Sequence, residues 1–239
     1  MKRALVTGGS GGIGSAISRR LAADGFHVAI HAHRGLETAQ TLAGEILAGG
    51  GSAEALSFDV TDGEAVRASL EALQEKGPIQ VLINNAGIID DGAFPGMSEE
   101  QWRCVIDVSV NGFFNVTQPL TLPMIRTRWG RIVTISSVAA IIGNRGQVNY
   151  AAAKGALHSA TKSLSLELAS RGITVNAVAP GIIATSVSAA SFDEQAIHRL
   201  VPMKRVGRPE EVADLVGFLC SNQAAYITGQ IISINGGMI

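Results

Sequence analysis

The chain has 239 residues, of which 46% are hydrophobic and 16% charged, and its formal net charge is −1. This balance is typical of an α/β domain with strands buried on both faces, and it argues against a generally basic nucleic-acid-binding protein. The two cysteines and five histidines show no disulfide or metal-ligand spacing, so we expect no metal site. No apolar run is long enough for a membrane span or a signal peptide, so we expect a cytoplasmic protein.

Short runs rich in Val and Ile alternate with stretches of helical periodicity along the whole chain. Strands are expected at residues 3–7, 27–30, 53–58, 81–83, 131–135, 173–178 and 231–234. Helices are expected at residues 13–23, 36–47, 64–75, 102–126, 150–170 and 209–220. This alternation predicts right-handed crossovers and a parallel sheet with helices on both faces. No linker, repeat or shift in composition divides the chain, so we expect a single domain over residues 1–239.

The first expected strand leads into a glycine-rich turn, VTGGSGGIGSAI. Its glycines fit two related spacings, G-x-G-x-x-G with Gly9, Gly11 and Gly14, and G-x-x-x-G-x-G with Gly8, Gly12 and Gly14. Glycine lets the chain turn sharply and approach a pyrophosphate, which the amide groups at the start of the next helix bind. A tight turn without a ligand is the alternative, but the position after the first strand of a β/α chain favours a dinucleotide site.

The second expected strand ends without the acidic residue that an NAD site usually places against the ribose 2′-hydroxyl. The sequence there is HVAIHAHRG, and His33 and Arg34 stand where a 2′-phosphate would lie. Arg34 offers a charged, forked donor, and the hydroxyl of Ser10 could add a hydrogen bond. Arg34 could also be an ordinary solvated arginine, but the missing acid favours NADPH over NADH.

A serine, a tyrosine and a lysine form the candidate catalytic group. Ser137 follows the expected strand at residues 131–135, and Tyr150 and Lys154 lie one helical turn apart in YAAAK. Reduction of a ketone needs a proton for its oxygen, and an ordinary tyrosine pKa of about 10 is too high for easy transfer at neutral pH. We expect Lys154 to lower the pKa of Tyr150 by about 2–3 units and Ser137 to stabilise the developing negative charge. The alternative is that YAAAK is only a good helix former.

These motifs together resemble the short-chain dehydrogenase/reductase family along essentially the whole chain. The matching segments are TGGSGGIG (7–14), NNAG (84–87), Asn111, Ser137, YAAAK (150–154) and PG (180–181). Four longer segments are similar to 3-oxoacyl-[acyl-carrier-protein] reductases, namely GQVNYAAAKGAL (146–157), SRGITVNAVAPG (170–181), GRPEEVADLVGFL (207–219) and YITGQIISINGGM (226–238). The resemblance implies a doubly wound, Rossmann-type sheet of about seven strands, a nicotinamide cofactor and a homotetramer.

The resemblance also implies roles for particular residues. Together with the residues named above, it gives cofactor-binding positions at Gly8, Ser10, Gly12, Ile13, Gly14, His33, Arg34, Asp59, Val60, Asn84, Ala86, Gly87, Tyr150, Lys154, Pro180, Gly181, Ile183 and Thr185. Asp59 and Val60 would flank the adenine, and Ile183 and Thr185 would approach the nicotinamide amide. The catalytic positions it implies are Asn111, Ser137, Tyr150 and Lys154. Asn111 would hold a water that links Lys154 to solvent, a role that bends its helix.

Two arginines and one long segment concern the substrate. Arg128 and Arg171 match the arginines with which acyl-carrier-protein reductases bind their acidic partner. Each also lies near a helix C-terminus, where a cation is favourable in any case. Residues 182–205 are expected to form a substrate lid.

These features lead us to expect an enzyme that uses NADPH to reduce a 3-oxoacyl thioester on acyl carrier protein, in fatty-acid or polyene/polyketide-type chain synthesis. A short-chain dehydrogenase of a free alcohol, sugar or steroid is the alternative in the same class. A non-catalytic dinucleotide-binding sensor or scaffold is the alternative from another class. The intact Ser137, Tyr150 and Lys154 argue against this last reading, because a pure binder has no need of a proton donor.

Overall fold

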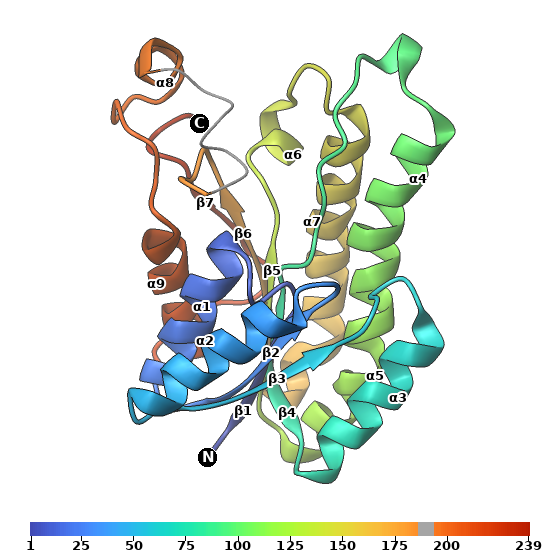
Figure 1. Ribbon diagram of the computed structural model, residues 1–239, viewed down its shortest axis with the longest axis vertical. Coiled ribbons are helices and arrows are strands. Elements are labelled where there is room, and N and C mark those ends of the chain that lie inside the picture. The colour runs from blue at the N-terminus through green and yellow to red at the C-terminus, as the bar shows by residue number, and fades with distance from the viewer. Residues whose placement is uncertain (186–193) are drawn as a thin grey trace.

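A parallel sheet forms the centre of the computed structural model, which describes residues 1–185 and 194–239 (Figure 1). Within these residues the sheet has seven strands, β1 (Arg3–Val6), β2 (His27–Ala32), β3 (Ser52–Ser57), β4 (Ile79–Asn84), β5 (Gly130–Ile135), β6 (Ile173–Pro180) and β7 (Ile231–Ile234). Their order is β3-β2-β1-β4-β5-β6-β7. The chain therefore starts in the middle of the sheet and winds outward in both directions, with the switch point between β1 and β4. The expected doubly wound α/β fold is confirmed.

Helices cover both faces of the sheet. In the described residues they are α1 (Gly12–Ala23), α2 (Leu36–Ala48), α3 (Gly63–Glu75), α4 (Glu99–Ile106), α5 (Gly112–Thr127), α6 (Ala139–Ile142), α7 (Val148–Leu168), α8 (Glu194–Leu200) and α9 (Pro209–Cys220). The first face packs against α1, α2 and α9, and the second packs against α3, α5 and α7 (Figure 1). Because the strands are parallel, the connections that follow β1, β4 and β5 all leave from the carboxyl edge of the sheet.

Burial on both faces explains why the central strands read as continuous apolar runs. In β1, Ala4 and Val6 belong to the hydrophobic cluster beneath α1 and α9, whereas Leu5 belongs to the cluster beneath α3 and α5. All three are 0% exposed. Burying an aliphatic side chain such as Leu5 contributes about 1.5–3 kcal/mol to folding. The sheet is thus a well-packed frame, and the segments at its carboxyl edge are held by it.

The structure corrects one expected helix. The helix predicted at residues 102–126 is divided into α4 and α5 by a π-helical turn at Asp107–Asn111. Gly112, the first residue of α5, lies so close to Val60 that a Cβ on it would be 2.9 Å from the Val60 Cγ2 atom. A π turn adds one residue to an α-helical repeat, and hydrophobic periodicity is too coarse to reveal it.

We predict that Gly14 tolerates no side chain. A Cβ there would collide with the carbonyl oxygen of Gly8 and lie 2.7 Å from Nδ2 of Asn85, so Gly14→Ala should lower the free energy of unfolding by about 1–3 kcal/mol. Gly44 in α2 is the matched control, because a Cβ there meets nothing within 4 Å. Gly44→Ala should therefore raise the free energy of unfolding by about 0.5–1 kcal/mol. Urea unfolding measures both, and equal stabilities would contradict the close packing at Gly14.

Candidate active site

The glycine-rich turn lies between β1 and α1 at the carboxyl edge of the sheet. Gly8 adopts a left-handed backbone conformation with φ of +59°, which glycine allows at low cost. The Thr7 hydroxyl oxygen accepts from the amides of Asn85 and Ala86, both at 3.0 Å. Asn85 Nδ2 in turn donates to the carbonyl oxygen of Gly8 at 3.0 Å, so the turn is tied to the end of β4. Gly11 is the N-cap of α1 and has no side chain to occupy the first amides of the helix, which suits them to bind an anion.

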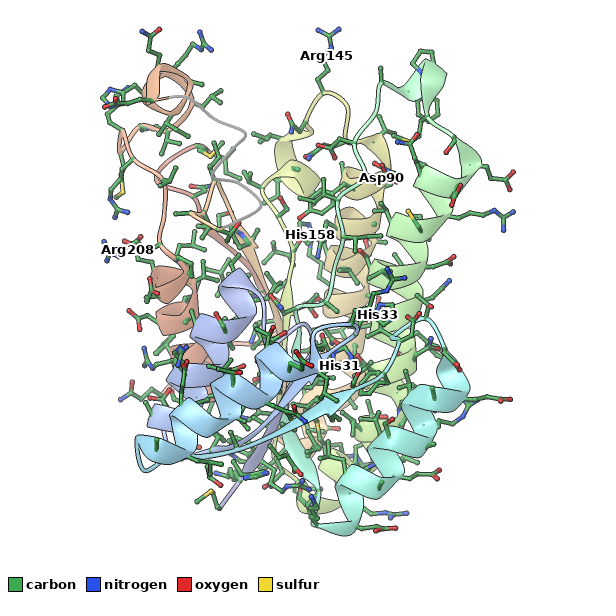
Figure 2. All side chains as sticks on the ribbon, in the orientation of Figure 1. His31, His33, Asp90, Arg145, His158 and Arg208 are labelled. Atoms are coloured by element: carbon green, nitrogen blue, oxygen red, sulfur yellow. The ribbon has the colours of Figure 1, made fainter. Side chains whose placement is uncertain are left out.

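The segments that follow β2 and β3 carry two basic side chains, His33 (labelled in Figure 2) and Arg34, and one carboxylate, Asp59. His33 Nε2 lies 3.5 Å from Asp59 Oδ2, and Asp59 Oδ1 accepts hydrogen bonds from the amide and hydroxyl of Thr61 at 2.9 and 2.8 Å. Burial acts to raise the pKa of Asp59, but the Thr61 hydrogen bonds and the charges of His33 and Arg34 lower it overall. Arg34 is exposed and forms no hydrogen bond or ion pair within residues 1–185 and 194–239. Its guanidinium is available to an anion, whereas Asp59 is already engaged.

Ser137, Tyr150 and Lys154 meet at the carboxyl end of β5. The Lys154 ammonium donates to the carbonyl oxygen of Ile135 at 2.9 Å and lies 5.7 Å from the centre of the Tyr150 ring. Ser137 lies near enough to Tyr150 to act on its phenol and to lower its pKa. Gly87 leaves room for the ammonium, because a Cβ there would lie 3.1 Å from Nζ. This arrangement can hold an oxygen atom beside two hydroxyl groups with a cation behind them.

Burial determines the protonation of this group. Lys154 is 4% exposed and forms no ion pair with the described residues, and burial lowers its pKa to about 8. Burial also raises the pKa of Tyr150, and the nearby Ser137 opposes this only in part. The expected fall in the Tyr150 pKa is therefore wrong for the folded chain, because desolvation outweighs a cation at 5.7 Å. The phenol keeps its proton at neutral pH.

Asn111 ends the π-helical turn and is exposed. Its Nδ2 atom donates to Oδ1 of Asp107, one turn earlier, at 2.6 Å. The helix does depart from α geometry here, where the resemblance to short-chain dehydrogenases/reductases requires a bend. No hydrogen bond joins Asn111 to Lys154 in the part of the chain that the structure describes, so a water link between them stays a prediction.

A cavity of about 380 Å³ opens in front of the tyrosine. The candidate site residues that line it are Ile13, Gly87, Ser137, Tyr150, Lys154, Pro180, Gly181, Ile183 and Thr185. Apolar side chains complete the lining, among them Ile89, Ile142, Leu200 and Met238. The cavity therefore joins the glycine turn to an apolar wall. Of the expected lid, residues 182–185 and 194–205 contribute Ile182, Ile183, Thr185 and Leu200 to this lining, and residues 186–193 lie outside the described residues.

Two candidate cofactor-binding residues, Asn84 and Val60, have side chains that are buried against neighbouring residues. Asn84 is 8% exposed, and its Nδ2 donates to the hydroxyl of Thr117 at 3.0 Å. Val60 is 5% exposed and lies against Gly112. These side chains support the cofactor edge of the sheet from beneath rather than facing the cavity.

The structure brings Arg128 and Arg171 together but away from the site. Arg128 follows α5 and Arg171 precedes β6, so both lie at the amino edge of the sheet. Nη2 of Arg128 donates to the carbonyl oxygen of Ser170 at 3.2 Å, and both arginines are exposed. The six residues of β5 separate Arg128 from Ser137, a span of about 20 Å at roughly 3.3 Å per residue.

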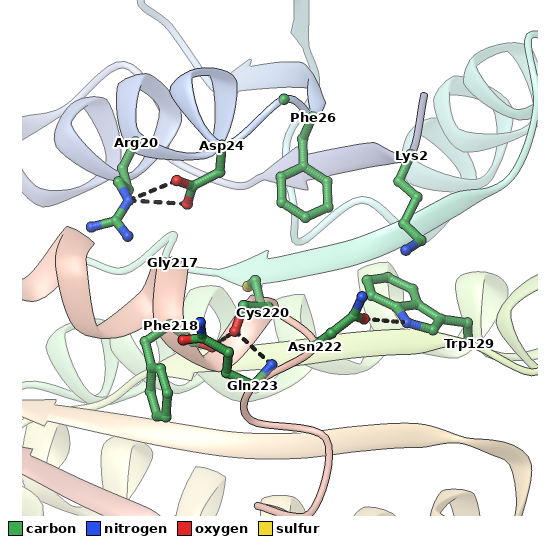
Figure 3. Close-up of a pocket in the computed structure, with 12 residues that line it drawn as sticks. Lys2, Arg20, Asp24, Phe26, Trp129, Gly217, Phe218, Cys220, Asn222 and Gln223 are labelled. Carbon is green, nitrogen blue, oxygen red and sulfur yellow. Dashed lines mark hydrogen bonds and ion pairs between the residues drawn. The ribbon is translucent and has the colours of Figure 1, made fainter.

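A larger cavity, of about 730 Å³, also lies at the amino edge, between the ends of α1 and α9 (Figure 3). Its charged side chains already interact with neighbours. Arg20 forms an ion pair with Asp24, and the Lys2 ammonium lies 3.9 Å from the centre of the Trp129 ring. Because it is remote from Tyr150 and its charged groups already interact with neighbours, it is not the candidate site, despite its size.

The described residues hold no group of three or more His, Cys, Asp or Glu side chains placed to bind a metal ion. Among the described helices, none combines the length and apolar character needed to cross a bilayer.

Comparisons with known proteins agree with this geometry. A family model described as enoyl-(acyl carrier protein) reductase matches residues 8–239. The chain is 44% identical to a 3-oxoacyl-[acyl-carrier-protein] reductase FabG of Aggregatibacter actinomycetemcomitans, over 98% of both chains. The chain belongs to the short-chain dehydrogenase/reductase family. It is also 44% identical to the FabG reductase of Staphylococcus aureus strain Mu50 and 43% identical to nodulation protein G of Azospirillum brasilense, in both cases over 99% of this chain and 98% of the relative.

One supporting residue of this short-chain dehydrogenase/reductase was missed in the sequence. Asn149 is 0% exposed, and its Nδ2 donates to the carbonyl oxygens of Asp90 and Gln101 at 2.9 and 3.0 Å. Its Oδ1 accepts from the amide of Tyr150 at 2.8 Å. Asn149 therefore fixes the start of α7, and with it the tyrosine, to the segment that follows β4. An asparagine directly before YAAAK is the only sequence signal, and it does not distinguish this role from an ordinary helix start.

Proposed function

We propose that the chain reduces the ketone of a 3-oxoacyl thioester, carried by acyl carrier protein, to the 3-hydroxyacyl thioester, with NADPH as reductant. The observation that carries this proposal is the cavity in which Ser137, Tyr150 and Lys154 face an apolar wall beside the glycine turn. The names of the FabG relatives, which are 44% identical over nearly their whole length, support the same substrate class.

The residues at the end of β5 suit reduction in particular. When bound, NADPH would supply the hydride to the ketone carbon. Ser137 would donate a hydrogen bond to the ketone oxygen and stabilise the negative charge that develops there. Tyr150 would give its proton to the same oxygen, and its raised pKa means that the proton is present before the reaction. Oxidation of an alcohol would need a phenolate at the start, which burial disfavours.

Lys154 would act on the tyrosine after the proton has left. The phenolate would face an ammonium that lies 5.7 Å from the ring centre, and opposite charges attract more strongly in a buried site than in water. The hydrogen bond to Ile135 holds the ammonium in this place. Asn111 would hold the water through which Lys154 and Tyr150 recover a proton from solvent.

The preference for NADPH would depend on Arg34. Its guanidinium has no hydrogen-bond or ion-pair partner among the described residues, and β2 itself ends without an acidic residue that would bind a ribose hydroxyl. A Cβ on the next residue, Gly35, would lie 3.9 Å from the Ser10 hydroxyl oxygen, which places this hydroxyl beside the arginine. A forked cation and a hydroxyl together suit a phosphate on the ribose.

Arg128 and Arg171 lie at the amino edge, away from the cavity of their own chain. A carrier protein bound to them would therefore present its acyl group to the cavity of a second copy of the chain. Large apolar side chains on the outer helices support self-association, since Phe114 and Leu122 of α5 are 62% and 60% exposed and Leu166 of α7 is 83% exposed. If two copies packed antiparallel through these helices, the arginines of one copy would approach the cavity of the other. The resemblance implies a homotetramer.

Consumption of NADPH with an acetoacetyl thioester tests the function. The wild-type protein should reduce the thioester, and Tyr150→Phe should lose at least about 100-fold in kcat while still binding NADPH. Tyr226→Phe is the matched control, because Tyr226 is the other tyrosine and is fully exposed. NADPH binding without any reduction would favour the sensor or scaffold, and activity on free alcohols alone would favour a small-molecule dehydrogenase. A crotonyl thioester tests the enoyl reduction named in the family description.

Replacement of Arg34 tests the cofactor preference. Arg34→Ala should raise KM for NADPH about tenfold or more, because charge-assisted hydrogen bonds to the phosphate are lost, and should leave KM for NADH within about twofold. Arg67→Ala removes another exposed arginine, on α3, and is the control. Equal losses with both cofactors would argue against a 2′-phosphate contact.

Charge reversal tests the docking site. A variant carrying Arg128→Glu and Arg171→Glu should lose about tenfold or more in kcat/KM for a 3-oxoacyl group on acyl carrier protein, since acidic partners are then repelled. Its activity on acetoacetyl coenzyme A should stay within about twofold of wild type if the fold and cavity are intact. A parallel loss on both substrates would show that the arginines support the fold rather than the carrier.

A further inference from the structure

His31 is a buried histidine between the glycine turn and the end of β3 (Figure 2). It lies near the carboxyl end of β2 and is 1% exposed. Its Nδ1 accepts a hydrogen bond from the amide of Gly8 at 3.1 Å, and its Nε2 donates to the carbonyl oxygen of Phe58 at 2.9 Å. The rings of His31 and Phe58 also pack together, with centres 4.0 Å apart. The imidazole thus joins two segments that both border the proposed cofactor site.

The partners of His31 fix its tautomer. An amide can only donate and a carbonyl oxygen can only accept, so Nδ1 must be the bare nitrogen and Nε2 must carry the hydrogen. A protonated imidazole would point a second N–H at the Gly8 amide. Burial lowers the pKa of His31 to about 4, and the charge of His33 lowers it further. The hydrogen bond to the Phe58 carbonyl and the charge of Asp59 act in the opposite direction. The acceptor is therefore present throughout the neutral pH range.

The hydrogen bond acts on the residue that shapes the turn. Gly8 is left-handed, and its own carbonyl oxygen accepts from Asn85 Nδ2 at 3.0 Å and from the Gly11 amide at 3.3 Å. The amide of Gly9 donates to the backbone carbonyl of His31 at 2.8 Å. Both amides at the entry of the turn thus point inward, toward β2, and the amides at the start of α1 remain for an anion.

We propose that His31 is a positioning residue that holds the glycine turn in its cofactor-binding conformation through the Nδ1 acceptor. The inference rests on the proposed function, in that NADPH is taken as the ligand of the turn. Phe58 is followed directly by Asp59 and Val60, which the family resemblance places beside the adenine. His31 therefore sets the phosphate and adenine parts of the site at a fixed separation.

Three substitutions distinguish the role of the Nδ1 acceptor from that of the Nε2 donor. His31→Asn keeps an acceptor near the place of Nδ1, because the shorter amide ends there, and loses the donor to Phe58. His31→Gln can place an amide N–H near the position of Nε2 but has no acceptor facing Gly8. His31→Leu lacks both. Direct titration of NADPH by fluorescence gives Kd for each variant, steady-state kinetics give KM and kcat, and thermal unfolding reports the fold.

The proposal predicts that affinity follows the acceptor. Kd and KM for NADPH should rise about tenfold or more in His31→Gln and His31→Leu, because the Gly8 amide loses its partner. His31→Asn should stay within about threefold of wild type. The loss should fall on Kd and KM rather than on kcat at saturating NADPH, which a general loss of stability would not produce.

Equal Kd values for the Asn and Gln variants, or a loss seen only in kcat or melting temperature, would overturn the proposal. So would a wild-type protein that binds no NADPH. Failure of the proposed substrate is a separate outcome. A protein that binds NADPH but does not reduce 3-oxoacyl thioesters still shows, by its Kd values, whether NADPH affinity depends on the acceptor at residue 31.

Discussion

A buried ammonium without a carboxylate is the constraint on which this site depends. Among the described residues, the ammonium of Lys154 forms one hydrogen bond, to the Ile135 carbonyl oxygen. It also lies near the ring of Tyr150. Such a cation is costly to bury. The proposed reaction would explain it, because the charge would become favourable when the phenol beside it loses a proton. In the proposed reaction the stabilising charge would lie where negative charge develops, rather than where it exists beforehand.

The doubly wound sheet makes this placement possible. The turns that follow β1, β4 and β5 leave the same edge on either side of the switch point, and they bring together Gly8, Gly87 and Ser137. Hydrogen bonds across these turns, such as those of Thr7 with the end of β4, fix their relative positions. Close packing at the glycines leaves little freedom. The chemistry therefore depends on the backbone of three loops as much as on the side chains of α7.

Much of this arrangement could be predicted from the sequence, because glycine turns and the i, i+4 spacing of Tyr150 and Lys154 impose strict geometry. The position of Arg128 and Arg171 was also within reach, since each precedes a strand and must lie at the amino edge. The resemblance predicts a bend in the helix at Asn111, but hydrophobic periodicity could not show that the bend is a π turn closely packed on Val60. The raised pKa of Tyr150 could not be predicted, because it results from burial among distant segments. The contacts of His31 could not be predicted either, because its partners Gly8 and Phe58 lie in the segments that follow β1 and β3.

The pH dependence of kcat for acetoacetyl thioester reduction tests the role of the Lys154 charge most directly. Burial sets the pKa of Lys154 at about 8, below its ordinary value, so the ammonium is present below that pH and lost above it. We predict that the wild-type kcat falls as the pH rises through about 8. In Lys154→Arg, whose charge is permanent, any remaining activity should show no such fall. A wild-type kcat that stays constant or rises through this range, or the same decline in both proteins, would contradict the account.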